Sequence, residues 1–409
     1  MNINLGIEGR NAFEQLGSLT ELEPSQDLLS LVAWSVLCEP GDGTAGMLID
    51  QLGPSRALEQ LIRRSSADLL LRELGESGLE ITGESEPSLL KDLADGLEKW
   101  TPRLSFQGLL NSLRLHNQIG GKIIFEHEEV WPAGLLDLGV HRPRMLWCRG
   151  NREALASARK SISVVGSRVC SSYGESTAHE MVSAVASAGV AVVSGGAYGI
   201  DAAAHRAALA LGAPTIAILA GGLDALYPRG NTQLLNRIIA QGAVVSEVAP
   251  TVAPSKWRFL QRNRLIAATS QCTLVVEAGH RSGARNTASH AASLQRQVFA
   301  VPGPINSPAS QGCNLLIANK VAELIQSPSD LIEMAGFADF EVDNELAGLG
   351  ALETRALDAV GFSPTSTAEI AQLAGLTFSE VRFALANLKL AGLLIQQGSK
   401  WIRAGRSTV

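Results

Sequence analysis

The stretch SISVVGSRVCSSYGESTAHEMVSAVASAGVAVVSGG, residues 161–196, decides the fold. It begins with an apolar, β-branched run at 161–166, continues with a helical pattern over 173–188 and ends with a second apolar run at 190–194. Strands this apolar, joined by a helix, are typical of a parallel sheet that is covered on both faces. The stretch therefore predicts one strand–helix–strand unit of a doubly wound α/β fold.

The alternation of strands and helices continues toward the C-terminus. It predicts strands at 215–219, 243–247, 272–277 and 297–301 and helices at 200–211 and 231–240. We therefore expect an extended Rossmann-like, doubly wound and mainly parallel sheet. Ligands of such sheets bind beyond the carboxyl ends of the strands, so the residues that follow each strand are the candidates for function.

Both ends of the chain predict smaller domains. Residues 1–105 show short amphipathic helical patterns, with a solvated connection or an irregular helix between 75 and 102. Near the C-terminus, two capping boxes each open a helix and a hairpin follows, which is the pattern of a winged helix. The domains we predict are a helical one at 1–105, the Rossmann-like one at 106–328, an acidic linker at 329–349 and the winged helix at 350–409.

Charge is distributed unevenly over the 409 residues. The net charge of −6 divides into −11 for residues 1–100, +2 for 101–150, +7 for 151–327 and −4 for 328–409. Because local charge attracts phosphate, we expect an anionic partner to bind the middle segment. Chance sorting of solvated surface charge is the alternative explanation.

Several classes of protein are excluded by composition. No apolar run approaches the roughly 20 residues that span a bilayer, and the first residues lack the basic and then apolar pattern of a signal peptide. Five cysteines stand far apart without a CxxC pair, which argues against a zinc ribbon, a redox motif or a disulfide framework. We therefore expect a cytoplasmic protein with no membrane contact, no metal site and no cofactor.

Glycine, serine and arginine follow the strands of the central domain. Glycine lets a backbone approach a ligand closely, and N–H groups at the next helix N-terminus favour phosphate. Tight turns also need glycine, so each turn taken alone has a purely structural explanation. A second cluster, KWRFLQRNR at 256–264, adds arginines that could hold consecutive phosphates. The candidate DNA-binding residues are Gly166, Ser167, Arg168, Ser194, Gly195, Gly196, Arg229, Lys256, Arg262, Asn263, Arg264, Ser282, Gly283, Arg285 and Thr287.

Four further side chains have two interpretations each. Trp257, Phe259 and Tyr198 could stack on nucleobases, but we favour a place in the core for each. Glu277 follows a strand and could serve as a general base, but we favour a polar anchor for the neighbouring backbone. The Walker A, nucleophile-elbow, HExxH and dinucleotide GxGxxG motifs are absent from the sequence. Phosphate-binding turns without a catalytic motif indicate binding rather than catalysis.

Over residues 131–325 the sequence resembles the DprA/Smf family of DNA-processing proteins. Seven segments match the family in order: VVGSR (164–168), SGGAYGIDAAAH (194–205), AGGLDALYPRGN (220–231), RNRLIAATS (262–270), VVEAGHRSG (275–283), VFAVPG (298–303) and GCNLLI (312–317). Seven ordered matches make the resemblance specific.

The resemblance implies a non-catalytic protein that binds and protects single-stranded DNA and helps to load the RecA recombinase during DNA uptake or homologous recombination. It implies a homodimer, an N-terminal SAM-like helical domain and a C-terminal winged helix. It also implies phosphate contacts at Gly166, Ser167, Arg168, Arg229, Arg262 and Arg264, with Ser282, Gly283 and Thr287 lining the pocket.

Two departures from the family pattern concern this pocket. Leu260 and Gln261 stand where a proline is expected, and SGARNTA at 282–288 replaces SGSLxTA, so Arg285 adds a cation there. Arg382 and Lys389 are the basic residues of the predicted recognition helix, which favours protein contact for the winged helix. Two other functions stay open at this point, a nucleotide-processing enzyme of the phosphoribohydrolase type and a protein-interaction scaffold.

Overall fold

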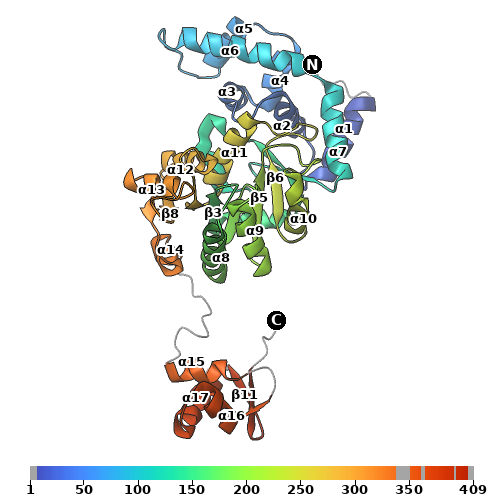
Figure 1. The fold of residues 1–409 in the computed structure, drawn as a ribbon. Helices are drawn as coiled ribbons and strands as arrows, with labels where there is room; N and C mark the ends of the chain where they lie inside the picture. The colour runs from blue at the N-terminus through green and yellow to red at the C-terminus, as the bar shows by residue number, and fades with distance from the viewer. Residues whose placement is uncertain (1–6, 338–350, 361–363, 391–392, 404–409) are drawn as a thin grey trace. The chain divides into compact units, whose positions relative to one another are not determined.

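The computed structural model describes residues 7–337, 351–360, 364–390 and 393–403. These residues fall into two compact units, one before and one after the break at 338–350 (Figure 1). Residues 338–349 of the predicted acidic linker lie outside the described part. The predicted domain boundaries themselves stay predictions.

A nine-stranded sheet forms the centre of the first unit. In spatial order its strands are β1 (Lys122–Phe125), β2 (Met145–Gly150), β6 (Ala243–Ser246), β5 (Thr215–Leu219), β4 (Ala191–Ser194), β3 (Ser161–Gly166), β7 (Cys272–Glu277), β8 (Gln297–Ala300) and β9 (Glu323–Leu324). All neighbouring pairs from β6 to β9 are parallel, whereas β2 pairs antiparallel with both β1 and β6. The prediction of a mainly parallel, doubly wound sheet is confirmed.

Helices cover both faces of the sheet. The helices α8 (Ser172–Ser187), α9 (Ile200–Ala210) and α14 (Pro328–Met334) pack on one face, and α11 (Lys256–Thr269), α12 (Gly283–Ser293) and α13 (Gln311–Ala318) on the other (Figure 1). Successive residues of β3 contribute to opposite faces of the sheet. Val164 belongs to the hydrophobic core under α8, α9 and α14, and Val165 belongs to the core under α11, α12 and α13. The short helices η2 (Ala133–His141) and η3 (Arg152–Lys160) join the second face.

Seven N-terminal helices share a hydrophobic core with the sheet. They are α1 (Ile7–Leu19), α2 (Gln26–Leu37), α3 (Gly43–Leu52), α4 (Pro54–Ile62), α5 (Ala67–Glu76), α6 (Glu86–Trp100) and α7 (Phe106–Gln118). Leu110 and Leu113 of α7 belong to one buried cluster with Phe125 and Trp147 of the sheet and Leu235 of α10 (Thr232–Gln241). The N-terminal helices therefore fold onto the sheet.

Helix α6 differs from the sequence prediction for residues 75–102. It is a regular helix of 15 residues that buries Leu93 and Trp100, rather than a solvated connection or an irregular helix. Its apolar residues lie three or four positions apart, as in an amphipathic helix. The Glu, Asp and Ser residues between them make this pattern hard to recognise in the sequence. Gly96 leaves room for Trp100, since a Cβ there would lie 2.5 Å from the indole ring.

The second unit contains the winged helix that the sequence predicts. It comprises α15 (Ala351–Asp358), β10 (Thr365–Ser366), α16 (Thr367–Ala374), α17 (Phe378–Leu390), β11 (Leu394–Gln397) and β12 (Lys400–Arg403) around a core of its own. Ser366 and Glu369 form a capping box, and the Glu380 carboxylate accepts from Thr377 N at 2.8 Å. The predicted pairs thus begin α16 and α17.

Two histidines are buried in the first unit and lack a partner on one ring nitrogen. His205 Nδ1 donates to Thr215 Oγ1 at 2.8 Å, because that hydroxyl already donates to Val192 O. Its Nε2 has no hydrogen-bond partner within the described part of the chain. Burial lowers the pKa of His205 to about 3 and that of His116 to about 4. Both rings are therefore neutral in the folded protein at neutral pH.

We expect stability to fall as the pH falls from about 6.5 toward 4. In that pH range the unfolded chain binds a proton on each of the two histidines and the folded chain does not. Each histidine therefore lowers the free energy of unfolding by up to about 1.4 kcal/mol per pH unit. Urea unfolding followed by circular dichroism between neutral and acid pH measures this slope. His205→Asn removes one titrating group and should make the slope shallower. An unchanged slope would contradict the assignment.

Among the described residues no helix is both long enough and apolar enough to cross a membrane.

Candidate functional site

A cavity of about 650 Å³ opens at the carboxyl ends of β3 and β7. Its walls come from the turn after β3, one face of α11 and the first turn of α12. We call it the strand-end cavity. Nine of the predicted binding residues line it: Gly166, Ser167, Arg168, Lys256, Arg262, Asn263, Ser282, Gly283 and Thr287.

The turn after β3 is fixed by backbone contacts. Gly166 packs so closely on α9 that a Cβ would lie 2.5 Å from Ile200 Cγ1. Ser167 N donates to Glu277 O at 2.6 Å, and Ile200 N donates to Ser167 O at 3.1 Å. The next side chain, Arg168, is exposed. The turn therefore presents an exposed cation from a backbone that hydrogen bonds hold in place.

Glu277 anchors the start of α8. Its carboxylate is 2% exposed and accepts from Ser171 N at 2.8 Å and from Ser171 Oγ at 2.6 Å. Ser171 is the N-cap of α8. The anchor interpretation that the sequence favoured is confirmed, and both carboxylate oxygens are occupied by it.

The first turn of α12 faces the strand-end cavity. Ser282 caps the helix, its Oγ accepting from Ala284 N at 3.3 Å, and Gly283 is exposed. The N–H groups at the start of an 11-residue helix carry partial positive charge and favour an anion. Asn263 Nδ2 donates to Asn286 Oδ1 at 3.1 Å, which holds α11 and α12 together at this point.

Arg262 forms the floor of the cavity rather than a free cation. It is 5% exposed, and its Nη1 donates to Gly195 O and Ile218 O. Gly195 has to be glycine, because a Cβ would lie 2.4 Å from that Nη1. Burial lowers the pKa of Arg262 to about 10, and the neighbouring Asp201 opposes this shift. Arg262 thus clamps the ends of β4 and β5.

Asp201 completes the clamp. Its Oδ2 accepts from Gly195 N at 3.2 Å and from Ala197 N at 3.4 Å. Burial raises the pKa of Asp201, while the charge of Arg262 and both backbone N–H groups oppose the rise. The turn after β4 is therefore held from both sides by buried groups of opposite charge.

The other six predicted residues are not brought into the strand-end cavity. Ser194 ends β4, and Gly195 and Gly196 follow it in the turn. All three are buried, and Ser194 Oγ donates to Val164 O at 2.6 Å. Arg229 is exposed on η4 (Arg229–Asn231), outside the lining of the strand-end cavity. Their positions suit a role in the fold or at the rim.

Arg264 and Arg285 are used elsewhere. Arg264 is 4% exposed and its Nη2 lies 2.5 Å from Glu247 Oε2, on the side of α11 opposite to Arg262. Arg285 donates from Nη1 to His280 O. The extra cation of the SGARNTA segment therefore stabilises the loop before α12.

The aromatic residues are more exposed than the sequence analysis expected. Trp257 is 56% exposed and Tyr198 46%, so a place in the core is wrong for both. Trp257 lies in the first turn of α11. Tyr198 lies in the turn after β4, where its hydroxyl accepts from Gly230 N at 3.2 Å. Phe259 is half-buried, and the Arg168 guanidinium lies 4.5 Å from its ring centroid. A notch of about 30 Å³ beside the cavity is lined by Tyr198, Tyr227 and Phe259.

Residues outside the predicted set also line the strand-end cavity, and Arg281, Leu260 and Ala284 are among them. Arg281 adds an exposed cation, Leu260 is 44% exposed and Ala284 lies behind Ser282. Arg281, like Arg285, is one of the arginines that the sequence adds to the cluster at 256–264. The apolar lining had no signal in the sequence. The cavity thus combines exposed cations, a helix N-terminus and aromatic faces.

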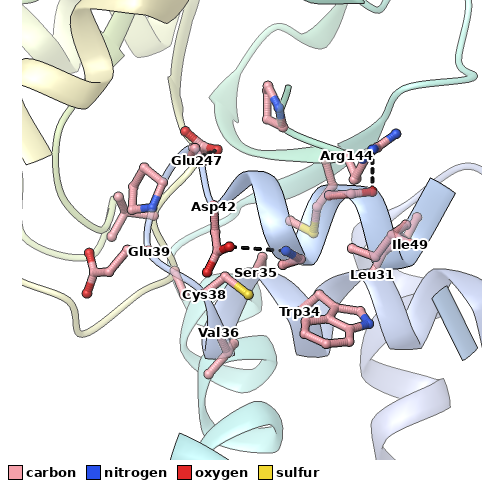
Figure 2. Close-up of a pocket in the computed structure, with 18 of the residues that line it drawn as sticks. Leu31, Trp34, Ser35, Val36, Cys38, Glu39, Asp42, Ile49, Arg144 and Glu247 are labelled. Atoms are coloured by element: carbon pink, nitrogen blue, oxygen red, sulfur yellow. Dashed lines mark hydrogen bonds between the residues drawn. The ribbon is translucent and has the colours of Figure 1, made fainter. Parts of the chain in front are cut away.

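A third cavity, of about 340 Å³, lies between the N-terminal helices and the sheet. Figure 2 shows the carboxylates of Glu39, Asp42 and Glu247 on one side of it and Arg144 on another. The charges around it pair with one another: Arg258 Nη2 lies 2.7 Å from Glu39 Oε1, and Arg144 Nη2 lies 2.7 Å from Asp50 Oδ2. We interpret this cavity as the polar seam that joins the two parts of the first unit.

Known proteins match this chain along most of its length. The family described as DNA recombination-mediator protein A matches residues 122–336, and the DprA winged helix domain matches 343–399. The "Putative DNA processing protein DprA" of Mycobacterium tuberculosis (strain CDC 1551 / Oshkosh) is 40% identical over 72% of this chain and 80% of its own. "Protein Smf" of Escherichia coli (strain K12) is 35% identical over 75% and 83%.

A solved structure shares the fold. The crystal structure of DNA processing protein A from Streptococcus pneumoniae has a TM-score of 0.57 and 27% identity to this chain. The match covers 78% of this chain and 98% of that one. The sequence resemblance and the fold therefore lead to the same group of proteins.

Proposed function

Since the chain belongs to the DprA/Smf family, we propose that it binds single-stranded DNA in the strand-end cavity without acting on it chemically. The observation that carries the proposal is the convergence of exposed Arg168, Lys256 and Arg281 with the first turn of α12 around one cavity. Charge-assisted contacts of this kind suit the phosphates of a nucleic-acid backbone.

The aromatic residues beside the cavity favour a single strand. Unpaired bases present their faces, and stacking on an aromatic side chain does not depend on base identity. Phe259 and Tyr198 stand within or beside the cavity where such bases would lie. The absence of a catalytic role is part of the proposal and is supported by Glu277, whose carboxylate is engaged by Ser171.

Arg168→Glu should weaken binding to a labelled oligothymidylate by about ten-fold or more, because it replaces an exposed phosphate contact by a repelling charge. Binding should also fall with salt, and the slope of log K against log salt should become shallower by about 0.7 for one lost phosphate contact. Fluorescence anisotropy at several salt concentrations measures both quantities.

The matched control is Arg237→Glu, which makes the same charge change on an exposed residue of α10. It should leave the affinity and the slope nearly unchanged. Equal losses of DNA affinity in the two variants would show that the effect comes from the net charge of the protein and not from a contact of Arg168. No loss in either variant would favour the scaffold interpretation over DNA binding.

We also propose that the bound strand is passed to a RecA recombinase and that the protein acts as a homodimer. Family membership supports both statements. RecA filament formation on single-stranded DNA, with wild type and Arg168→Glu compared, tests the first. Sedimentation velocity over a range of concentrations tests the second, and a monomer at every concentration would overturn it.

A further inference from the structure

Helix α11 has a second functional face. Lys256, Phe259 and Arg262 line the strand-end cavity, whereas Trp257 and Gln261 line a different groove of about 680 Å³. We call this the far groove. The loop between α2 and α3, the end of α6, η1 (Thr101–Arg103), η2 and α12 form its other walls.

Apolar side chains form part of the wall of the far groove. Trp257 on its wall is 56% exposed. Leu138 and Leu294 also line it, and both are half-buried. An exposed indole beside apolar lining in a concave surface is typical of a binding site.

The charges of the far groove nearly balance. Three cationic side chains and three carboxylates line it. Each carboxylate already has a partner inside the protein: Asp137 pairs with Arg296 (2.7 Å), Glu39 with Arg103 (2.9 Å) and Asp42 with the indole N–H of Trp100 (2.8 Å). Such a groove suits the faces of nucleobases better than a run of phosphates.

Resting on the function proposed above, we propose that the far groove takes bases of the same DNA strand beyond the part held in the strand-end cavity, with one base stacked on Trp257. The two sites adjoin the same turn of the protein, because Lys256 lines one and Trp257 the other and the two residues are successive in the first turn of α11. A strand that leaves the cavity across this turn meets the indole next.

Oligonucleotides of two lengths test the proposal, because a short one fills only the strand-end cavity. With oligothymidylates of about five and about twenty nucleotides, Trp257→Ala should lose about ten-fold in affinity for the long one and almost nothing for the short one. Trp257→Phe keeps an aromatic face and should restore most of the loss, whereas a role in packing alone would not separate the two lengths.

Tryptophan fluorescence gives a second readout. The other tryptophans of the first unit, Trp34, Trp100, Trp131 and Trp147, are at most 4% exposed. In a Trp401→Phe background, which removes the partly exposed indole of the winged helix, the long oligonucleotide should quench the emission and the short one should not.

Equal losses for both lengths, or no quenching by the long oligonucleotide, would overturn the inference while leaving the proposed function intact. Failure of the wild-type protein to bind either oligonucleotide would instead overturn the proposed function. The two failures are therefore distinguishable in one set of measurements.

Discussion

Arg262→Met is expected to lower the free energy of unfolding by about 3–5 kcal/mol, because it leaves Asp201 buried without a compensating charge. It also removes the donor to Gly195 O and Ile218 O, so two buried carbonyl groups lose a partner. Urea unfolding monitored by circular dichroism measures the loss. DNA affinity should fall as well, since the turn after β4 is no longer held against the floor of the strand-end cavity.

Two comparisons make the result interpretable. Arg168→Met changes an exposed arginine and should lower DNA affinity while moving the unfolding free energy by only about 0.5 kcal/mol. Adding Asp201→Asn to Arg262→Met removes the stranded carboxylate and should restore part of the stability. If Arg262→Met lowered affinity without lowering stability, Arg262 would be the direct phosphate contact that the family resemblance implies.

Gly199→Val should destabilise the first unit by about 3 kcal/mol or more, through backbone strain and steric overlap together. Gly199 has φ +73°, which a β-branched residue rarely adopts, and a Cβ there would lie 2.1 Å from Ser167 O. Relief of the overlap would displace the turn that carries Arg168, so DNA affinity should fall too. Thermal unfolding and anisotropy measure the two effects.

Gly212→Val separates strain from overlap. Gly212 has φ +67° in the same unit, but a Cβ there would meet nothing within 4 Å. This variant should show the smaller cost of strain alone and keep its DNA affinity. Equal effects at the two glycines would contradict the proposed role of the contact between Gly199 and Ser167.

The strands of the sheet could be predicted closely because each is a short apolar run bounded by turn residues. The runs at 215–219 and 272–277 coincide with β5 and β7. Helix α6 was missed because its stripe is narrow and lies in a strongly acidic, serine-rich segment. The burial of Trp100 stabilises α6, and the local sequence pattern does not show that this side chain is buried.

The position of the strand-end cavity could be predicted from the sequence, but the contacts of each arginine could not. Parallel strands carry their carboxyl ends to one edge, so the residues after β3 and β7 had to meet there. Arg262 and Arg264 lie two positions apart on α11 and therefore point to different sides of the helix. Arg262 forms part of the cavity floor, and Arg264 pairs with Glu247. The tertiary structure, not the local sequence, brings Glu247 close to Arg264.

Aromatic exposure was also beyond the sequence. Trp257 and Tyr198 are residue types that are often buried in a core. The neighbouring sequence does not show whether another helix or strand packs over their side chains. The structure leaves both partly exposed at the edge where the proposed ligand binds.

The hydrophobic core that the N-terminal helices share with the sheet has an evolutionary consequence. Leu110 and Leu113 fit Phe125 and Trp147, so transfer of these helices to another protein would require matching changes on the recipient's sheet. The winged helix has a separate core built around Val381, Leu385 and Leu388. Exchange of the winged helix would therefore leave the core of the first unit intact, whereas exchange of the N-terminal helices would not.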